Sequence, residues 1–221
     1  MKRNRDTDNE VSQLYTLISG GESQTLDFKF AITDSKKIAK SLSAFANTDG
    51  GSLLIGVKDN GVIAGTDGDE EYYMIETAAQ IYCRPEVRFS AHLINVGEKN
   101  VLKIDIPKGK SRPYCAKDNN DKWLAYVRVK DENVCADRII FQSWKNQNSS
   151  KSLAIKYRRH QDFVMKYLEE KNKISVQEVS KYLELKRYEA ENVLISLMTA
   201  SVIEPIFDFK PQIFYVLKNN L

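Results

Sequence analysis

The spacing of hydrophobic positions changes several times along the chain, and each change predicts a different element. Apolar residues at helical spacing predict helices in the first two thirds of the chain at 10–18, 35–47, 69–83 and 136–145. Alternating or continuous apolar runs predict strands at 25–30, 52–57, 87–96, 101–106 and 123–129. Strands mixed with helices in this order predict an α/β (α+β) domain, in which helices cover a mixed sheet.

Local signals mark where these elements begin and end. Ser35 is a good N-cap for the second helix because its hydroxyl can accept from the first free amides. Gly50 and Gly51 follow that helix and suit a left-handed helix end. The sequence Asp59-Asn60-Gly61 after the buried strand predicts a hairpin turn.

A polar break at 146–152 has no apolar side chain, and it predicts two domains, 1–147 and 153–221. The second would contain three helices and two β-prone runs at 159–171, 176–183, 187–199, 202–207 and 213–217. This order is typical of a winged helix-turn-helix, in which 187–199 would be the recognition helix. A small helical interaction or dimerisation module is the alternative.

Composition narrows the class of protein without naming a partner. Hydrophobic residues make up 42% of 221 residues, enough for a substantial core. No apolar run approaches the eighteen or so residues that span a bilayer, so a cytoplasmic protein without a membrane partner is expected. The three cysteines are widely spaced, which indicates reduced thiols. The net charge of +3 is small, so any nucleic-acid contact must come from local basic patches.

Asp27 and Lys29 are two residues apart on a predicted strand, so both side chains leave the same face. Metal-dependent nucleases use this D-x-K pattern: the carboxylate holds a divalent cation and the ammonium orients water or neutralises phosphate. Glu22 and Asp59 are candidates for further Mg²⁺ or Mn²⁺ ligands. A solvated strand face with a normal Asp59 turn is the alternative interpretation.

Basic residues form further candidate contacts with nucleic acid. Lys36, Lys37 and Lys40 lie on one side of the helix at 35–47 by their spacing, where they could follow a phosphate backbone. A wet helix face is the alternative. The remaining basic candidates are Lys29, Arg112, Lys117, Arg128, Lys130, Lys186 and Arg187. Tyr114 and Tyr126 could offer stacking surfaces, and interior packing is an equal alternative for Tyr126.

Other catalytic patterns are weak or missing in the sequence. Thr48-Asp49-Gly50-Gly51 could form a small backbone concavity for phosphate, but the chain has no G-x-x-x-x-G-K-[ST] motif. ATP binding therefore stays open. Because the chain has only two histidines, a Ser/His/Asp or Cys/His catalytic set is not expected.

Four ordered segments carry a family resemblance: E-S-x-x-x-D-F-K at 22–29, S-A-F-A-N-T-D-G-G at 43–51, L-L-I-G-V-K-D-N-G at 53–61 and A-Y-V-R-V at 125–129. Together they resemble the Schlafen/AlbA-type domain of bacterial regulators. The resemblance implies DNA binding or transcription regulation, often with a winged-helix tail, and some relatives are described as ATP-binding.

In nuclease-active Schlafen relatives, three acids form a metal-dependent RNA-cleaving site. By motif they fall here on Glu22, Asp27 and Asp59, with Asp27 reaching less far than a glutamate. The favoured hypothesis is a nucleic-acid-binding regulator that contacts phosphate through the first domain and DNA through the second. The alternative is a ribonuclease that uses Mg²⁺ or Mn²⁺. A scaffold without nucleic acid is the third hypothesis. The choice between DNA and RNA, and the question of a homodimer, stay open.

Overall fold

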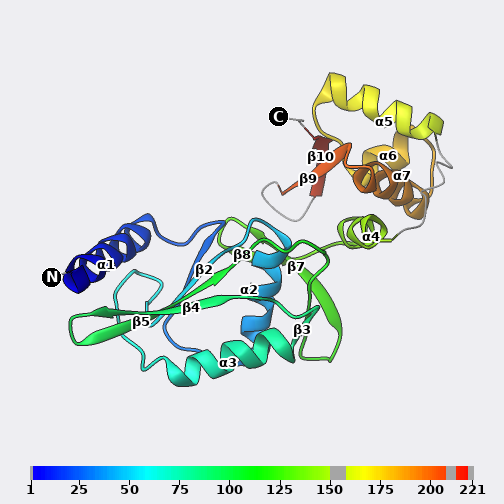
Figure 1. Cartoon of the computed structure of the whole chain (residues 1–221). Helices are drawn as coiled ribbons and strands as arrows, with labels where there is room; N and C mark the ends of the chain where they lie inside the picture. Colours follow the sequence, from blue (N-terminus) through cyan, green and yellow to red (C-terminus); the bar gives the residue numbers. More distant parts are fainter. Residues whose placement is uncertain (1, 150–157, 208–212, 219–221) are drawn as a thin grey trace. The chain divides into compact units, whose positions relative to one another are not determined.

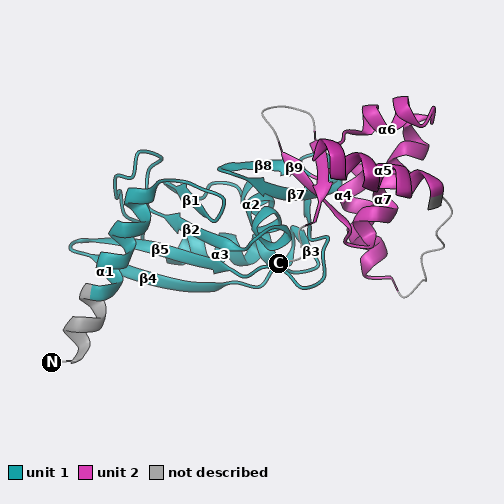
Figure 2. Cartoon of the chain, turned by 90° about the horizontal axis from the view of Figure 1, so that it is seen from above, with its two compact units in different colours: residues 1–135 teal, residues 136–221 magenta. Residues whose placement is uncertain are grey.

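The computed structural model of the protein describes residues 2–149, 158–207 and 213–218. The chain forms two compact units, residues 1–135 and 136–221 (Figure 2). The helix at 138–147 therefore belongs to the second unit, whereas the sequence analysis placed it in the first domain. Part of the predicted linker at 146–152 lies outside the described residues. Within the described chain, no helix is both long and apolar enough to cross a membrane.

The first unit is built on a four-stranded mixed sheet in the order β1-β2-β5-β4. Its strands are β1 (Leu26–Lys29), β2 (Gly51–Ile55), β4 (Ser90–Val96) and β5 (Lys99–Ile106). β1 and β2 are parallel, and the other pairs are antiparallel. The carboxyl ends of β1 and β2 therefore lie at the same edge of the sheet.

Helices cover both faces of this sheet (Figure 1). They are α1 (Lys2–Gly20) on one face and α2 (Ser35–Asn47) with α3 (Asp69–Gln80) on the other. Alternation along β2 divides the core, because Leu54 packs with Leu14 of α1, whereas Leu53 and Ile55 pack with α2 and α3. This arrangement confirms a mixed sheet covered by helices.

A second four-stranded sheet packs against α2. Its strands, in spatial order, are β3 (Cys83–Arg84), β6 (Cys115–Lys117), β7 (Trp123–Val129) and β8 (Glu132–Cys135). The helix is buried over most of its length from Ile38 to Asn47, as expected for an element between two sheets. Its cap is Asp34, which accepts from the amides of Lys36 and Lys37, so the prediction of Ser35 as the cap was one residue too late.

In its described residues, the second unit contains four helices and a hairpin. They are α4 (Arg138–Gln147), α5 (Arg158–Lys171), α6 (Val176–Tyr182), α7 (Arg187–Thr199), β9 (Ile203–Phe207) and β10 (Ile213–Leu217). A capping box of Ser175 and Glu178 starts α6. The two strands pair antiparallel, and Ile174 bridges to Tyr215 of β10.

Candidate functional site

The D-x-K face of β1 points into the protein. As predicted, both side chains leave the same face, and Lys29 Nζ lies 2.8 Å from Asp27 Oδ2. Asp27 is buried, at 3% exposed, whereas the Lys29 side chain keeps about a third of its surface exposed. Lys29 also donates to the carbonyl of Phe28, at 2.8 Å. The charge of Lys29 is therefore partly used inside the fold.

Arg128 of β7 lies directly against this face and is 2% exposed. Its guanidinium donates to Asp27 Oδ1 at 3.3 Å and to the carbonyls of Leu26 at 3.2 Å and Ser23 at 3.3 Å. A fourth hydrogen bond goes to Asn133 Oδ1 at 3.1 Å. The prediction that Arg128 contacts phosphate is therefore corrected: burial removes it from the surface, and it ties β7 to the start of β1.

Glu22 lies beside Asp27 and anchors the same segment. Its Oε1 accepts from the backbone amide of Phe28 at 2.7 Å. Burial raises the pKa of Glu22, and a hydrogen bond and charge repulsion from Asp27 raise it further. The sequence prediction that these two acids meet agrees with this geometry.

The third predicted acid does not join them. Asp59 is exposed in the turn after β2, where the Lys58 amide donates to the Val62 carbonyl at 3.0 Å. Among the described residues, no group of three or more His, Cys, Asp or Glu side chains is arranged to hold a metal ion. The residues in this arrangement do not fit the predicted three-carboxylate Mg²⁺ or Mn²⁺ site.

An exposed aromatic side chain lies where β1 ends. Phe30 is 58% exposed, and Lys58 Nζ lies 5.8 Å from the centre of its ring. The predicted strand at 25–30 included Phe30, but β1 ends at Lys29. Neither Phe30 nor Lys58 was identified as a candidate from the sequence. A lysine nevertheless follows the buried residues of each segment: Lys29 follows Phe28, and Lys58 follows Val57.

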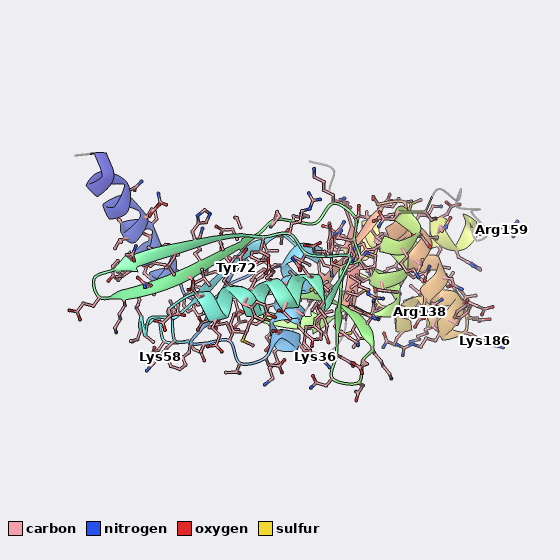
Figure 3. The ribbon with its side chains drawn as sticks, turned by 60° about the horizontal axis from the view of Figure 1, so that its bottom comes forward. Lys36, Lys58, Tyr72, Arg138, Arg159 and Lys186 are labelled. Carbon is pink, nitrogen blue, oxygen red and sulfur yellow. The ribbon has the colours of Figure 1, made fainter. Side chains whose placement is uncertain are left out.

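Lys36, the first lysine of α2, lies seven residues after Lys29, which ends β1. Figure 3 shows Lys36 and Lys58 on the same side of the first unit. Lys36 pairs with Asp121 at 3.4 Å, an exposed acid whose pKa Lys117 and Lys36 lower. Lys37 is exposed, and its side chain has no ion-pair partner in the described parts of the chain. Phe30, Lys29, Lys36, Lys37 and Lys58 are called the β1-end surface below.

Lys40 and the later basic candidates have more structural roles. Lys40 Nζ lies 5.8 Å above the ring of Tyr126, which is buried. Arg112 is partly buried and donates to the Asn47 carbonyl at the end of α2, at 3.4 Å. Burial lowers the pKa of Arg112. Lys130 is exposed in a left-handed turn with φ of 57°.

The Thr48–Gly51 turn does not form a phosphate cradle. The amides of Thr48 and Gly50 both donate to the Phe45 carbonyl, and that of Ser52 donates to Thr25. A side chain on Gly50 would lie 2.8 Å from the Ile106 carbonyl oxygen. The two glycines are therefore explained by close backbone packing, and they supply no argument for ATP.

The exposed side chains of α7 lie in its first turn. Of the thirteen α7 residues, all described, seven are buried and only Arg187 and Tyr188 are exposed. Helix α4 packs along α7: Arg138 pairs with Glu191 at 2.8 Å, and Ser143 donates to the Ile195 carbonyl at 3.3 Å. That 187–199 is a recognition helix stays a prediction, and within α7 only the first turn is exposed for such a contact. Lys186, just before α7, is exposed (Figure 3).

Comparisons with known proteins agree with the sequence blocks. Residues 22–137, slightly more than half of the chain, match the Schlafen AlbA_2 family. The protein therefore belongs to the Schlafen AlbA_2 family. This result confirms the resemblance drawn from the four segments.

Two solved structures are similar at low identity. The DIP2311 protein from Corynebacterium diphtheriae is 22% identical over 68% of this chain and 30% of its own, with a TM-score of 0.43. This chain thus spans under a third of that protein. The N-terminal domain of a Nitrosomonas europaea protein described as related to the ATP-dependent DNA helicase RecG is 19% identical. That match covers 65% of this chain and 96% of that domain, with a TM-score of 0.41.

Proposed function

We propose that the protein binds nucleic acid through the β1-end surface and acts as a regulator. The observation that carries this proposal is the exposed ring of Phe30 beside the ammonium of Lys58. Exposed aromatic rings flanked by cations suit single-stranded nucleic acid, because an unpaired base stacks on the ring while the cations meet the backbone.

The charges of this surface support a phosphate contact. Lys37 is exposed. Lys36 pairs with the exposed Asp121 and lies 5.7 Å from the centre of the Tyr82 ring, and its side chain keeps 29% of its surface exposed, so both ammonium groups can be reached by phosphate. Lys29 contributes less because Asp27 already neutralises part of its charge. The β1-end surface therefore uses fewer of the predicted lysines than expected, and adds Lys58.

The second unit is proposed as a winged-helix variant that contacts duplex backbone. Three helices followed by an antiparallel hairpin have the order of that fold. Helix α4 packs along α7, so the contact with the DNA backbone is assigned to the exposed start of α7. Lys186, Arg187 and Tyr188 lie there. Arg138 stacks on Tyr188 at 4.5 Å and adds a further cation. This contact would read phosphates and leave base sequence largely unread.

Anisotropy titrations test the first-unit contact. A labelled single-stranded oligonucleotide should bind the wild-type chain more weakly at 300 mM than at 50 mM salt, because phosphate contacts release counterions. Phe30→Ala should lower affinity about tenfold, from the loss of one base stack. Lys166→Ala removes an exposed lysine of the second unit and serves as the matched control. Unchanged binding by Phe30→Ala would contradict the assignment.

The ribonuclease hypothesis stays a second candidate because Glu22 and Asp27 adjoin with Lys29 beside them. Glu22→Gln is the informative variant, since Asp27 also supports the fold through Arg128. Labelled RNA incubated with Mn²⁺ should be cut by the wild-type protein and spared by Glu22→Gln if the acids act chemically. Equal cleavage by both proteins, or by neither, rejects this hypothesis.

A further inference from the structure

Two loops of the first unit enclose a recess of about 630 Å³. One loop, residues 85–89, joins β3 to β4, and the other, residues 107–114, joins β5 to β6. Its walls are partly apolar, with Val87, Pro107 and Tyr114 among them. This volume falls within the range of small-ligand sites.

The charged side chains around the recess are mostly cationic. Arg88, Lys108 and Lys110 line it together with one acid, Glu86, so the lining carries a net charge of +2. Lys108 pairs with the half-exposed Asp49 at 3.3 Å. For Arg88 and Lys110, the described residues provide no hydrogen-bond or ion-pair partner. Two of the three cations are therefore not needed to neutralise the fold.

The loop that carries the two lysines is fixed to the end of α2. The Gly109 amide donates to the Ala46 carbonyl at 2.8 Å, and the Tyr114 amide donates to Asn47 Oδ1 at 2.8 Å. Asn47 Nδ2 in turn donates a hydrogen bond to the Tyr114 carbonyl at 2.7 Å. A Cβ at Gly109 would clash with the Tyr114 ring, so the ring packs directly on the loop backbone. Such anchoring lowers the ordering cost of binding.

Arg112, another basic residue of the 107–114 loop, has a structural role. Arg112 donates to the Asn47 carbonyl and so satisfies the end of α2. That duty leaves the cations at 88 and 110 without a structural explanation. Like charges gathered around one recess repel one another, and a bound anion would offset this repulsion.

We propose that this recess binds a phosphate group that carries two or more negative charges. The two lining loops, 85–89 and 107–114, contain no residue of the β1-end surface, so the site goes beyond the proposed function and does not depend on it. The net charge of +2 matches a phosphate monoester or pyrophosphate better than a singly charged phosphodiester. Such a group is supplied by a free nucleotide or by the phosphorylated end of a nucleic-acid strand.

Calorimetric titration of the full chain with pyrophosphate tests the site. Arg88→Ala and Lys110→Ala should each weaken binding about tenfold, since each removes one charge-assisted contact. Lys122→Ala is the matched control, because Lys122 is exposed but does not line the recess. It lies beyond the end of β6, whereas Tyr114 comes directly before that strand. Thermal melts should show all three variants folded, as these side chains are exposed. No wild-type binding, or wild-type affinity in both recess variants, would overturn the proposal.

Competition experiments separate the two sources. ATP that displaces pyrophosphate with higher affinity assigns the recess to a free nucleotide. A 5′-phosphorylated oligonucleotide that displaces it where the 5′-hydroxyl form does not assigns the recess to a strand end. Phe30→Ala should leave pyrophosphate binding unchanged, so loss of the recess and loss of the β1-end contact give different results.

Discussion

Removing the carboxylate of Asp27 should unfold the first unit far more readily than removing Lys29. Asp27 and Arg128 are 3% and 2% exposed, and the pair is joined at 3.3 Å. Loss of one partner from a buried pair costs about 3–5 kcal/mol, because the other charge stays buried without compensation. Lys29 keeps about a third of its side chain exposed, so Lys29→Ala should cost only about 0–1 kcal/mol.

Urea denaturation measures this difference. The chain has two tryptophans, and in a Trp144→Phe background the fluorescence of Trp123 reports on the first unit. Asp27→Ala should lower the free energy of unfolding by about 3–5 kcal/mol and the melting temperature by roughly 10 °C. The double variant Asp27→Leu with Arg128→Met should recover most of the loss. A cost of under about 1 kcal/mol for Asp27→Ala would show that the reasoning is wrong.

Three further outcomes can be measured directly. Burial and Asp137 raise the pKa of the Tyr215 hydroxyl above 10.0 in the folded chain, so the unfolded chain loses this proton at a lower pH. The free energy of unfolding, measured by urea titration, should therefore fall above pH 10, and Tyr215→Phe should flatten that fall. Burial raises the pKa of Cys83 to about 12, so a thiol reagent should label the exposed Cys135 quickly and Cys83 only after denaturation. Gly51→Ala should cost about 1–3 kcal/mol by differential scanning calorimetry, because its Cβ would lie 2.5 Å from an aromatic ring.

Much of the fold could be predicted because its apolar patterns are long. The helix at 35–47, the strand at 123–129 and the helix at 187–199 were predicted with the bounds that the structure has. The short strands β3, β6 and β8 were not predicted, because two to four residues carry too little periodicity. Helix α1 begins earlier than predicted, in a polar segment.

The candidate site was harder to predict, because spacing gives the face of a strand but not what covers that face. Asp27 and Lys29 were correctly placed together, yet nothing in their segment reveals that Arg128, about a hundred residues later, lies against them. Arg128 alternates between Val127 and Val129 in a strand, a pattern that normally indicates a solvent-facing cation. Only the pairing of distant elements shows which charges are accessible.

The packing of α4 along α7 decides where the chain can be divided for separate expression. A fragment that starts after residue 147 would lose the helix that shields Ile195 and Met198, and the bared apolar surface would promote aggregation. Asp137 caps α4 and accepts a hydrogen bond from Tyr215 at 3.1 Å, so it too must be retained. Cloning the second unit therefore requires a start at Ala136 or earlier.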